Sequence, residues 1–254
     1  MLTPTAAERP TIDPLLKRFD DTLENLDRFF NAVQHAISTS EKLKPLIHSI
    51  RARIKDRDHL QDKLLRKLHE CNKARQPFDI TPENLLVKIN DLIGFRLLHL
   101  HTVQAKEIHE QLDALLKSCG YVFREGPEAR TWDIGYEKTF QDMGFKTKRS
   151  DSLYTSVHYV ISDEVPNLTM TCEIQVRTLA EEIWGEVDHR LNYPHKMDSV
   201  ACTQQLRALA RSTSASGRLV DSIFATVRDE QSRQKAVVKP RPGSSGAARK
   251  KARR

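Results

Sequence analysis

The chain has 254 residues and a formal net charge of +7, from 41 lysines and arginines against 34 aspartates and glutamates. Its hydrophobic fraction of 39% excludes global disorder, no apolar run approaches the roughly 20 residues of a membrane span, and the N-terminus lacks the features of a signal peptide. The four cysteines form no CxxC pair, which argues against a zinc knuckle or a disulfide framework, so we expect a cytoplasmic protein that does not enter a membrane.

In the first half of the chain, apolar residues at helical spacing predict helices over residues 14–39 and 43–73, after which Pro77 and Pro82 mark a loop. The apolar run at 91–100 predicts a central strand buried on both faces. Residues 104–118 have a helical pattern. Residues 124–152 lack periodicity, and we expect a loop or an irregular insertion there.

In the second half, β-branched, aromatic and alternating residues predict strands over 153–162 and 168–176, followed by helices over 178–191 and 200–231. Residues 236–254 are of low complexity and predict a disordered tail. The strands lie in the middle of the chain, which favours an α/β (α+β) domain flanked by helices.

The positive charge is concentrated at the C-terminal end of the sequence. From Arg233 onward there are nine basic residues and no acidic one, which leaves 32 basic and 34 acidic side chains in the first 232 residues. The net charge is therefore weak evidence for a nucleic-acid partner of the folded body.

In each of two consecutive predicted strands, the alternation of residues places a row of candidate functional side chains on one face. Alternation along 168–176 places a carboxylate, an amide and a guanidinium on one face: Glu173, Gln175 and Arg177. Such a face could contact a phosphate–metal substrate, or it could be a solvated polar face with a cross-strand ion pair. The strand before it aligns an aromatic ring, a hydroxyl and an imidazole that could hold a base and a phosphate, or belong to an ordinary amphipathic strand: Tyr154, Ser156 and His158.

The apolar run at 91–100 carries two charged residues. Asp91 opens the run, where a carboxylate could hold Mg²⁺ against phosphates or could cap the strand. Arg96 lies inside the run, and because a buried guanidinium needs a partner, we expect it to pair with a carboxylate from the sheet or a flanking helix.

Basic residues form two further groups. In the helix predicted over 43–73, a ridge with a four-residue repeat follows Arg53, and it could bind an anion or be a solvated face beside nearby acids: Lys55, His59, Lys63 and Lys67. A second cluster, just before Tyr154, comprises Lys146, Lys148 and Arg149.

The order and spacing of these residues resemble the synthetase domain of the RelA/SpoT superfamily, the alarmone synthetases, over about residues 45–200. The family's Arg-x-Lys and the Lys eight positions after that Lys occur at Arg53, Lys55 and Lys63. Its Asp-x-x-Gly-x-Arg occurs at 91–96, its Tyr-x-Ser-x-His at 154–158, and its Glu-Ile-Gln-Val-Arg-Thr at 173–178. A closing helix carries the remaining family positions: Trp184, Glu186, His189, Tyr193 and Lys196.

This resemblance implies a nucleotidyltransferase-like mixed central sheet over 43–200, preceded by a helical segment at 1–42 and followed by a helical segment at 201–235 and the tail at 236–254. It implies transfer of the β,γ-pyrophosphoryl group of ATP to the ribose 3′-hydroxyl of GDP or GTP, with Mg²⁺ as cofactor and release of AMP. By this likeness Asp91 and Glu173 are catalytic: Asp91 would bind the metal, and Glu173 would bind the same metal or act as base on the acceptor 3′-hydroxyl.

The same likeness assigns the other residues. The ATP site would comprise Arg53, Lys55, His59 and Lys63. The acceptor site would comprise Lys148, Arg149, Tyr154, Ser156, His158, Gln175 and Arg177. The supporting residues would be Arg96, Trp184, His189 and Tyr193.

Two other functions stay open from the sequence. Some stand-alone members of the superfamily pyrophosphorylate the 3′ end of tRNA, and the cluster at 146–149 and the basic tail could contact RNA phosphates. A catalytically idle domain that binds nucleotide or RNA as a regulator is the second alternative. The apolar stripe of the helix predicted over 200–231 could pack on the domain's own core or on a second copy of the chain.

Overall fold

The computed structural model describes residues 2–150, 152–165, 168–192 and 197–238. Within these residues six strands form one mixed sheet, and in spatial order they are β1 (Ser49–Ile54), β2 (Ile93–His99), β6 (Leu168–Thr178), β5 (Ser156–Val165), β3 (Val122–Thr131) and β4 (Lys146–Arg149). The pairs β2–β6 and β3–β4 are parallel, and the other neighbours are antiparallel. The predicted α/β class with a mixed central sheet is confirmed.

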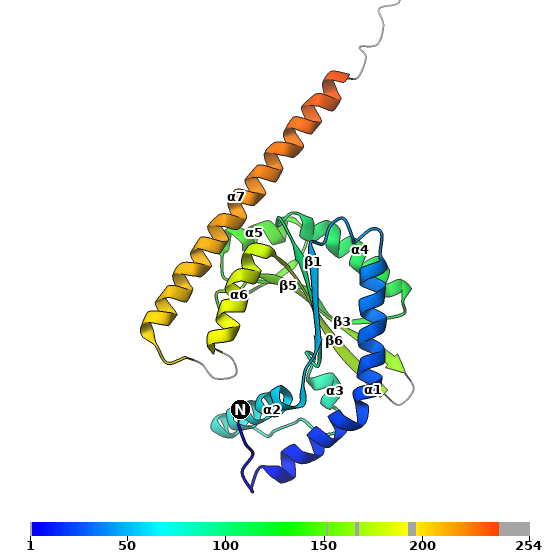
Figure 1. Ribbon diagram of the computed structural model, residues 1–254, viewed down its shortest axis with the longest axis vertical. Helices are drawn as coiled ribbons and strands as arrows, with labels where there is room; N and C mark the ends of the chain where they lie inside the picture. The colour runs from blue at the N-terminus through cyan, green and yellow to red at the C-terminus, as the bar shows by residue number, and fades with distance from the viewer. Residues whose placement is uncertain (1, 151, 166–167, 193–196, 239–254) are drawn as a thin grey trace, which may run out of the picture.

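Helices cover the two faces of the sheet differently. Helices α1 (Arg9–Thr39) and α4 (Gln104–Ser118) lie on one side, and α6 (Leu179–Asn192) and α7 (Val200–Val238) lie on the other (Figure 1). On the first side Phe30 of α1 stacks on Phe95 of β2 with ring centroids 5.3 Å apart, and His109 of α4 stacks on Tyr159 of β5 at 5.8 Å. This face is apolar and closed, so polar chemistry is confined to the face toward α6.

Helix α1 is part of the same hydrophobic core as the sheet. Its buried side chains recur at helical spacing, as the sequence predicts: Ile12, Leu15, Leu16, Phe19, Leu26, Phe29, Val33 and Ile37. Burying an apolar side chain of this size contributes roughly 1.5–3 kcal/mol. The N-terminal helix therefore stabilises the fold that holds the site. The boundaries expected at residues 42, 200 and 235 stay predictions.

The helix predicted over 43–73 is wrong in its first part. Residues 49–54 form the edge strand β1, and α2 (Arg57–Ala74) begins only after Asp56, whose side chain accepts a hydrogen bond from the His59 amide at 2.8 Å. Ile50 and Ile54 fit a helical repeat, but with Ala52 they also alternate as in a strand, and antiparallel pairing with β2 selects the strand. Lys55 consequently precedes α2 and does not belong to its basic ridge. The short helix α3 (Leu85–Lys88) leads into β2.

The loop expected at 124–152 is also wrong, because it contains most of β3, helix α5 (Ile134–Asp142) and β4. The pairing of β3 with β5 shifts register between Phe123 and Glu125 and again between Glu125 and Glu128, which removes the period-two pattern. Gly126 lies at this irregularity with φ +82°, and a Cβ there would lie 2.2 Å from the His158 carbonyl oxygen. Only glycine fits this close approach.

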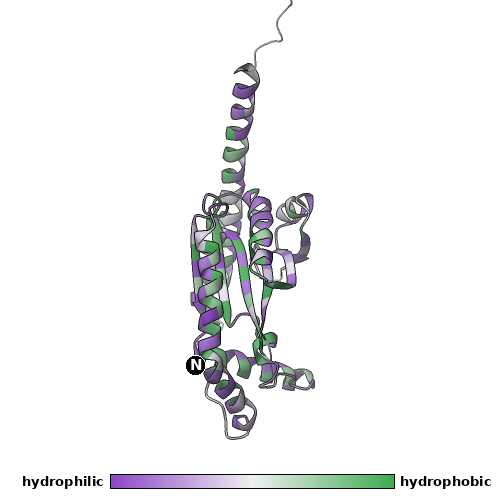
Figure 2. Cartoon of the chain, turned by 90° about the vertical axis from the view of Figure 1, so that its right-hand side faces the viewer, coloured by the Kyte–Doolittle hydropathy of each residue, from purple (hydrophilic) through white to green (hydrophobic). Residues whose placement is uncertain are grey.

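The remaining predicted elements are confirmed with small changes at their ends. Strand β2 lies between β1 and β6, helix α4 matches its predicted range, and β5 begins at Ser156, so Tyr154 precedes it. Helix α7 extends to Val238, and its C-terminal part projects beyond the rest of the chain (Figure 2). Residues 239–254, most of the tail predicted to be disordered, lie outside the described residues. Among the described helices, none combines the length and apolarity needed to cross a membrane.

Candidate active site

The strand registers place polar side chains in rows across the sheet. Arg51 of β1 is paired with Arg96 of β2, which is paired with Gln175 of β6, and Gln175 is paired with His158 of β5. Two residues along β1, the next row contains Arg53, Gly94 and Glu173. Because alternate residues of a strand share a face, both rows lie on the face toward α6.

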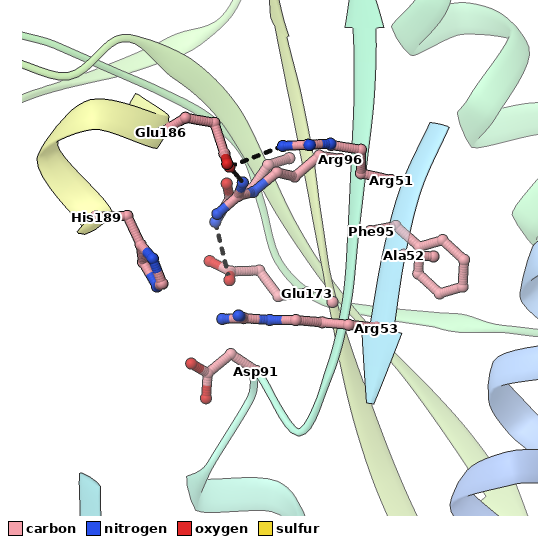
Figure 3. A pocket seen from close by; sticks show the side chains of 11 residues that line it. Arg51, Ala52, Arg53, Asp91, Phe95, Arg96, Glu173, Glu186 and His189 are labelled. Atoms are coloured by element: carbon pink, nitrogen blue, oxygen red, sulfur yellow. Dashed lines mark hydrogen bonds and ion pairs between the residues drawn. The ribbon is translucent and has the colours of Figure 1, made fainter. Parts of the chain in front are cut away.

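A cavity of about 330 Å³ opens over these rows, lined by Arg53, Asp91, Gly94, Glu173 and neighbouring residues. Figure 3 shows Arg53 extending from β1 between the carboxylates of Glu173 and Asp91. A Cβ on Gly94 would have no atom within 4 Å, so the missing side chain leaves the cavity floor open. The row thus presents one cation and two carboxylates to an open space large enough for part of a nucleotide.

Asp91, just before β2, is held by two lysines. Lys55 Nζ lies 3.1 Å from Asp91 Oδ2, and Lys63 Nζ of α2 lies 2.6 Å from Asp91 Oδ1. Burial by itself would raise the pKa of Asp91, but the two ammonium groups outweigh burial and hold that pKa below its ordinary value. Asp91 is therefore a carboxylate at neutral pH, and both lysines point toward the same site.

Glu173 ends a chain of hydrogen bonds. Its Oε1 lies 3.0 Å from His158 Nδ1, and its Oε2 accepts a hydrogen bond from Gln175 Nε2 at 3.0 Å. The Gln175 Oε1 accepts from the Tyr154 hydroxyl at 2.9 Å, which in turn accepts from Ser156 Oγ at 2.7 Å. Burial would raise the pKa of Glu173, but the hydrogen bonds and the charge of His158 lower it overall, so the ionised form is favoured.

Two further cavities adjoin the first. One of about 440 Å³ is lined by Tyr154, His158, Gln175 and Arg177 together with residues of α6, and it shares Gln175 with the first cavity. Another, of about 360 Å³, contains Lys63 and shares Asp91 and Glu173 with the first cavity. The two carboxylates consequently lie where the 330 Å³ and the 360 Å³ cavities meet.

Other predicted residues take different positions. Arg96 pairs with Glu186 of α6, Nη1 to Oε1 at 2.5 Å, as expected for a guanidinium within an apolar run. Trp184 lines the 440 Å³ cavity, and its Nε1 donates to the Leu206 carbonyl of α7 at 3.0 Å. His189 lines the 330 Å³ cavity. Burial, with Arg53 and Arg96 nearby, lowers the pKa of His189.

Five predicted residues line none of these three cavities, and a sixth is not described. Lys55 and Ser156 contact the lining residues Asp91 and Tyr154. His59 faces Asp56 at the start of α2, and their side chains are paired. Lys148 and Arg149 are exposed on the edge strand β4 and line none of the three cavities described above. Tyr193 lies outside the described residues.

Several residues of the site do not stand out in the sequence. The helical pattern predicted over 43–73 hides Arg51, although the alternation of Arg51 and Arg53 in a strand places both on one face. The loop predicted over 124–152 hides Arg130, which lies on β3 and lines both the 440 Å³ and the 360 Å³ cavities. Glu182 has no counterpart among the predicted residues, and its role depends on how α6 packs against the sheet.

The two carboxylates fit a magnesium ion. Mg²⁺ prefers oxygen ligands and is commonly bound by one or two carboxylates together with substrate phosphates. Asp91 and Glu173 line the same cavity, and the charge of Asp91 acts to raise the pKa of Glu173, because the two carboxylates repel each other. A bound cation would relieve this repulsion. Among the described residues there is no cluster of three or more histidine, cysteine or acidic residues suited to a metal, so an ion here would need substrate oxygens as well.

Comparison with models of protein families matches residues 52–198 to the region found in RelA and SpoT proteins. The chain belongs to the RelA/SpoT family. This RelA/SpoT region contains every strand of the sheet except the first three residues of β1. Comparison with curated protein sequences gave no match.

The fold of this RelA/SpoT protein is similar to that of solved structures. The small alarmone synthetase 1 from Bacillus subtilis aligns with a TM-score of 0.52 and 18% identity over 81% of this chain and 99% of that one. A GTP pyrophosphokinase family protein from Streptococcus pneumoniae aligns with a TM-score of 0.51 and 21% identity over 93% of this chain and 100% of that one. Family and fold together indicate a pyrophosphotransferase of the RelA/SpoT type, a family whose enzymes generally use a divalent metal.

Proposed function

We propose that this protein transfers the β,γ-pyrophosphoryl group of ATP to the ribose 3′-hydroxyl of GDP or GTP and so makes (p)ppGpp. The observation that carries the proposal is the position of Asp91 and Glu173, which both line the 330 Å³ and the 360 Å³ cavities, while Gln175, hydrogen-bonded to Glu173, also lines the 440 Å³ cavity. The 330 Å³ cavity contains arginines that could bind phosphates, and the 440 Å³ cavity contains the Tyr154 ring, on which a base could stack. A two-substrate transfer requires this arrangement, because both nucleotides must meet at one pair of carboxylates.

The donor side is built for a triphosphate. Arg53 extends into the 330 Å³ cavity, and Lys55 and Lys63 converge on Asp91 from another side. These cations would hold the phosphates of ATP, whose charge they partly neutralise. Asp91 and Glu173 would hold Mg²⁺, which when bound neutralises the charge that develops on the transferred and leaving phosphates.

The acceptor side is built for a nucleoside with a free hydroxyl. Tyr154 offers an aromatic ring, and Glu173 offers an ionised carboxylate held by His158 and Gln175. In the proposed reaction the 3′-oxygen attacks the β-phosphorus of ATP, the bond from that phosphorus to the bridging oxygen of the α-phosphate breaks, and AMP leaves. Glu173 accepts the hydroxyl proton.

The solved structures that resemble this chain support nucleotide substrates. Small alarmone synthetase 1 from Bacillus subtilis has been solved bound to AMPCPP and bound to its product pppGpp. The second of these aligns with a TM-score of 0.52 and 19% identity. The likeness lies in the fold, and the acceptor used by the present chain requires a direct assay.

The deciding experiment supplies ATP labelled in its γ-phosphate with GDP, GTP or deacylated tRNA as acceptor. We expect label in the guanine nucleotide together with AMP release, and we expect Asp91→Asn and Glu173→Gln to lose at least 100-fold in rate, within the range ascribed to acid–base groups of about 10²–10⁴. A variant of the exposed Glu24, Glu24→Gln, is the control. Label in tRNA alone would replace the proposal by the tRNA alternative, and no AMP with any acceptor would favour an idle regulator.

A further inference from the structure

An acidic pair on α6 holds arginines from three neighbouring strands. Glu182 Oε1 accepts from Nη1 of Arg51 on β1 at 3.0 Å and from Nη1 of Arg96 on β2 at 3.3 Å. Glu186 Oε1 contacts the same two atoms at 2.9 and 2.5 Å. Figure 3 shows Glu186 meeting Arg51 and Arg96 above the row of Arg53 and Glu173. The two glutamates thus make equivalent contacts on the side of the 330 Å³ cavity.

Glu182 differs from Glu186 by one additional partner. Its second oxygen, Oε2, forms an ion pair with Nη2 of Arg177 on β6. The Arg177 side chain is 2% exposed and the Glu182 side chain 9%, against 31% for Glu186. The carboxylate of Glu182 is therefore a buried link between Arg51 and Arg96 of the first cavity and Arg177 of the 440 Å³ cavity, which Arg96 also lines.

Arg177 is confined on two sides. Its guanidinium lies over the Tyr154 ring, with Cζ 5.5 Å from the ring centroid. On the other side it approaches the backbone of α6 at Gly185, where a Cβ would lie 2.6 Å from Arg177 Nη1. Helix α6 is itself held to α7 by the hydrogen bond of Trp184 Nε1 to the Leu206 carbonyl. The guanidinium is thus held between the α6 backbone and the ring, and Glu182 determines its position.

We propose that Glu182 is a positioning residue that aligns both halves of the site. Through Arg51 and Arg96 it orders the donor cavity, and through Arg177 it fixes the Tyr154 ring against which the acceptor base packs. Gly185 serves the same arrangement by leaving room for the guanidinium. The inference deepens the proposed function and rests on it for the identity of the two substrates.

Burial makes the position of Arg177 depend on the charge of Glu182. A buried carboxylate that loses its charge leaves Arg177 as an unpaired buried cation, which then moves toward water or toward another anion. In either case the Tyr154 ring loses the group that packs on one of its faces. Loss of the Glu186 charge has a smaller effect, because Glu182 still holds Arg51 and Arg96 and the Arg177 pair is untouched.

The kinetic test compares Glu182→Gln with its matched control Glu186→Gln, in assays of the full chain with ATP and the guanine nucleotide. We expect Glu182→Gln to raise the acceptor KM about tenfold, because Arg177 loses its buried ion-pair partner, while Glu186→Gln leaves the acceptor KM within about twofold of the wild type. Gly185→Ala should repeat the acceptor effect without changing any charge. Equal acceptor KM values for the two glutamate variants would overturn the inference.

A second measurement needs no substrate. In a buried ion pair the guanidinium group of an arginine rotates slowly, so its N–H groups give resolved signals that can be followed by ¹H–¹⁵N NMR. The variant Arg177→Lys identifies the signals of Arg177. We expect the slowed Arg177 signal to persist in Glu186→Gln and to be lost in Glu182→Gln and in Gly185→Ala. A signal unchanged in Glu182→Gln overturns the inference, whereas a wild-type protein inactive with GDP and GTP overturns only the proposed function.

Discussion

Replacing Asp91 with asparagine perturbs the charge balance at the centre of the site. The Lys55 side chain is 3% exposed and its Nζ lies 3.1 Å from Asp91 Oδ2, so the variant leaves a buried ammonium without its counter-charge. Removing one partner of a buried ion pair costs about 3–5 kcal/mol. The Lys63 side chain is 24% exposed and can turn toward water, so we expect a cost at the lower end of this range. The free energy of unfolding at pH 7 should fall by about 3 kcal/mol, which corresponds to a fall in Tm of about 6–12 °C.

The loss should depend on pH in a defined direction. Burial lowers the pKa of Lys55 below its ordinary 10.5 even with Asp91 present, and loss of the carboxylate lowers that pKa further. Between the folded-state pKa and the value of about 10.4 in the unfolded chain, the unfolded state binds more protons, so stability rises with pH. The difference between wild type and Asp91→Asn is therefore largest near neutral pH and shrinks toward pH 10.

Urea unfolding followed by circular dichroism at pH 7 and at pH 10 measures this effect. The double variant Asp91→Asn/Lys55→Met is the control, because it removes the buried charge together with its partner and should regain most of the lost stability. If Asp91→Asn were as stable as the wild type at pH 7, or if the double variant gave no recovery, the assignment of Lys55 as a buried cation that depends on Asp91 would be refuted.

Two further predictions concern stability and ligand binding. Burial raises the pKa of Glu181 from an ordinary 4.5 to about 7, so the folded state keeps a proton that the unfolded state has lost, and stability falls by about 3 kcal/mol as the pH rises from 4.5 to 7. Glu181→Gln should remove that fall, and urea unfolding at pH 5 and pH 8 measures it with Glu24→Gln as the control; parallel profiles for Glu181→Gln and wild type would contradict the prediction. Gly94→Leu should fill the 330 Å³ cavity between Arg53 and Glu173, because a Cβ at Gly94 meets no atom within 4 Å. Calorimetric titration with a non-hydrolysable ATP analogue should show at least a tenfold loss of affinity at an unchanged Tm, and full affinity would place the donor elsewhere.

Much of the site could be predicted from the sequence where local pattern and tertiary role coincide. The period-two alternation of residues 168–178 places Glu173 and Gln175 on one face in both the sequence analysis and the structure. Arg96, within an apolar run, needs a carboxylate for electrostatic reasons alone, and it has one in Glu186. The apolar stripe of α1 likewise predicts the buried face of that helix.

The assignment of strands β1 and β3 required the tertiary structure. Residues 49–54 satisfy a helical and a strand period equally well, and pairing with β2 decides between them. Strand β3 has no clean alternation because two register shifts interrupt its pairing with β5. These two errors hid Arg51 and Arg130, since the direction of a side chain follows from the element to which its residue belongs.

The family and the mixed α/β class follow from the sequence alone, because ordered motifs and hydrophobic periods are local properties of the chain, and the catalytic role of the two carboxylates stays a prediction. Which charges meet depends on the tertiary structure. The ion pair of Arg177 with Glu182 and the convergence of Lys55 and Lys63 on Asp91 depend on the packing of α6 and α2 beside the sheet. Charge pairing depends on distances of a few ångströms and on burial, and neither quantity is encoded in spacing along the sequence.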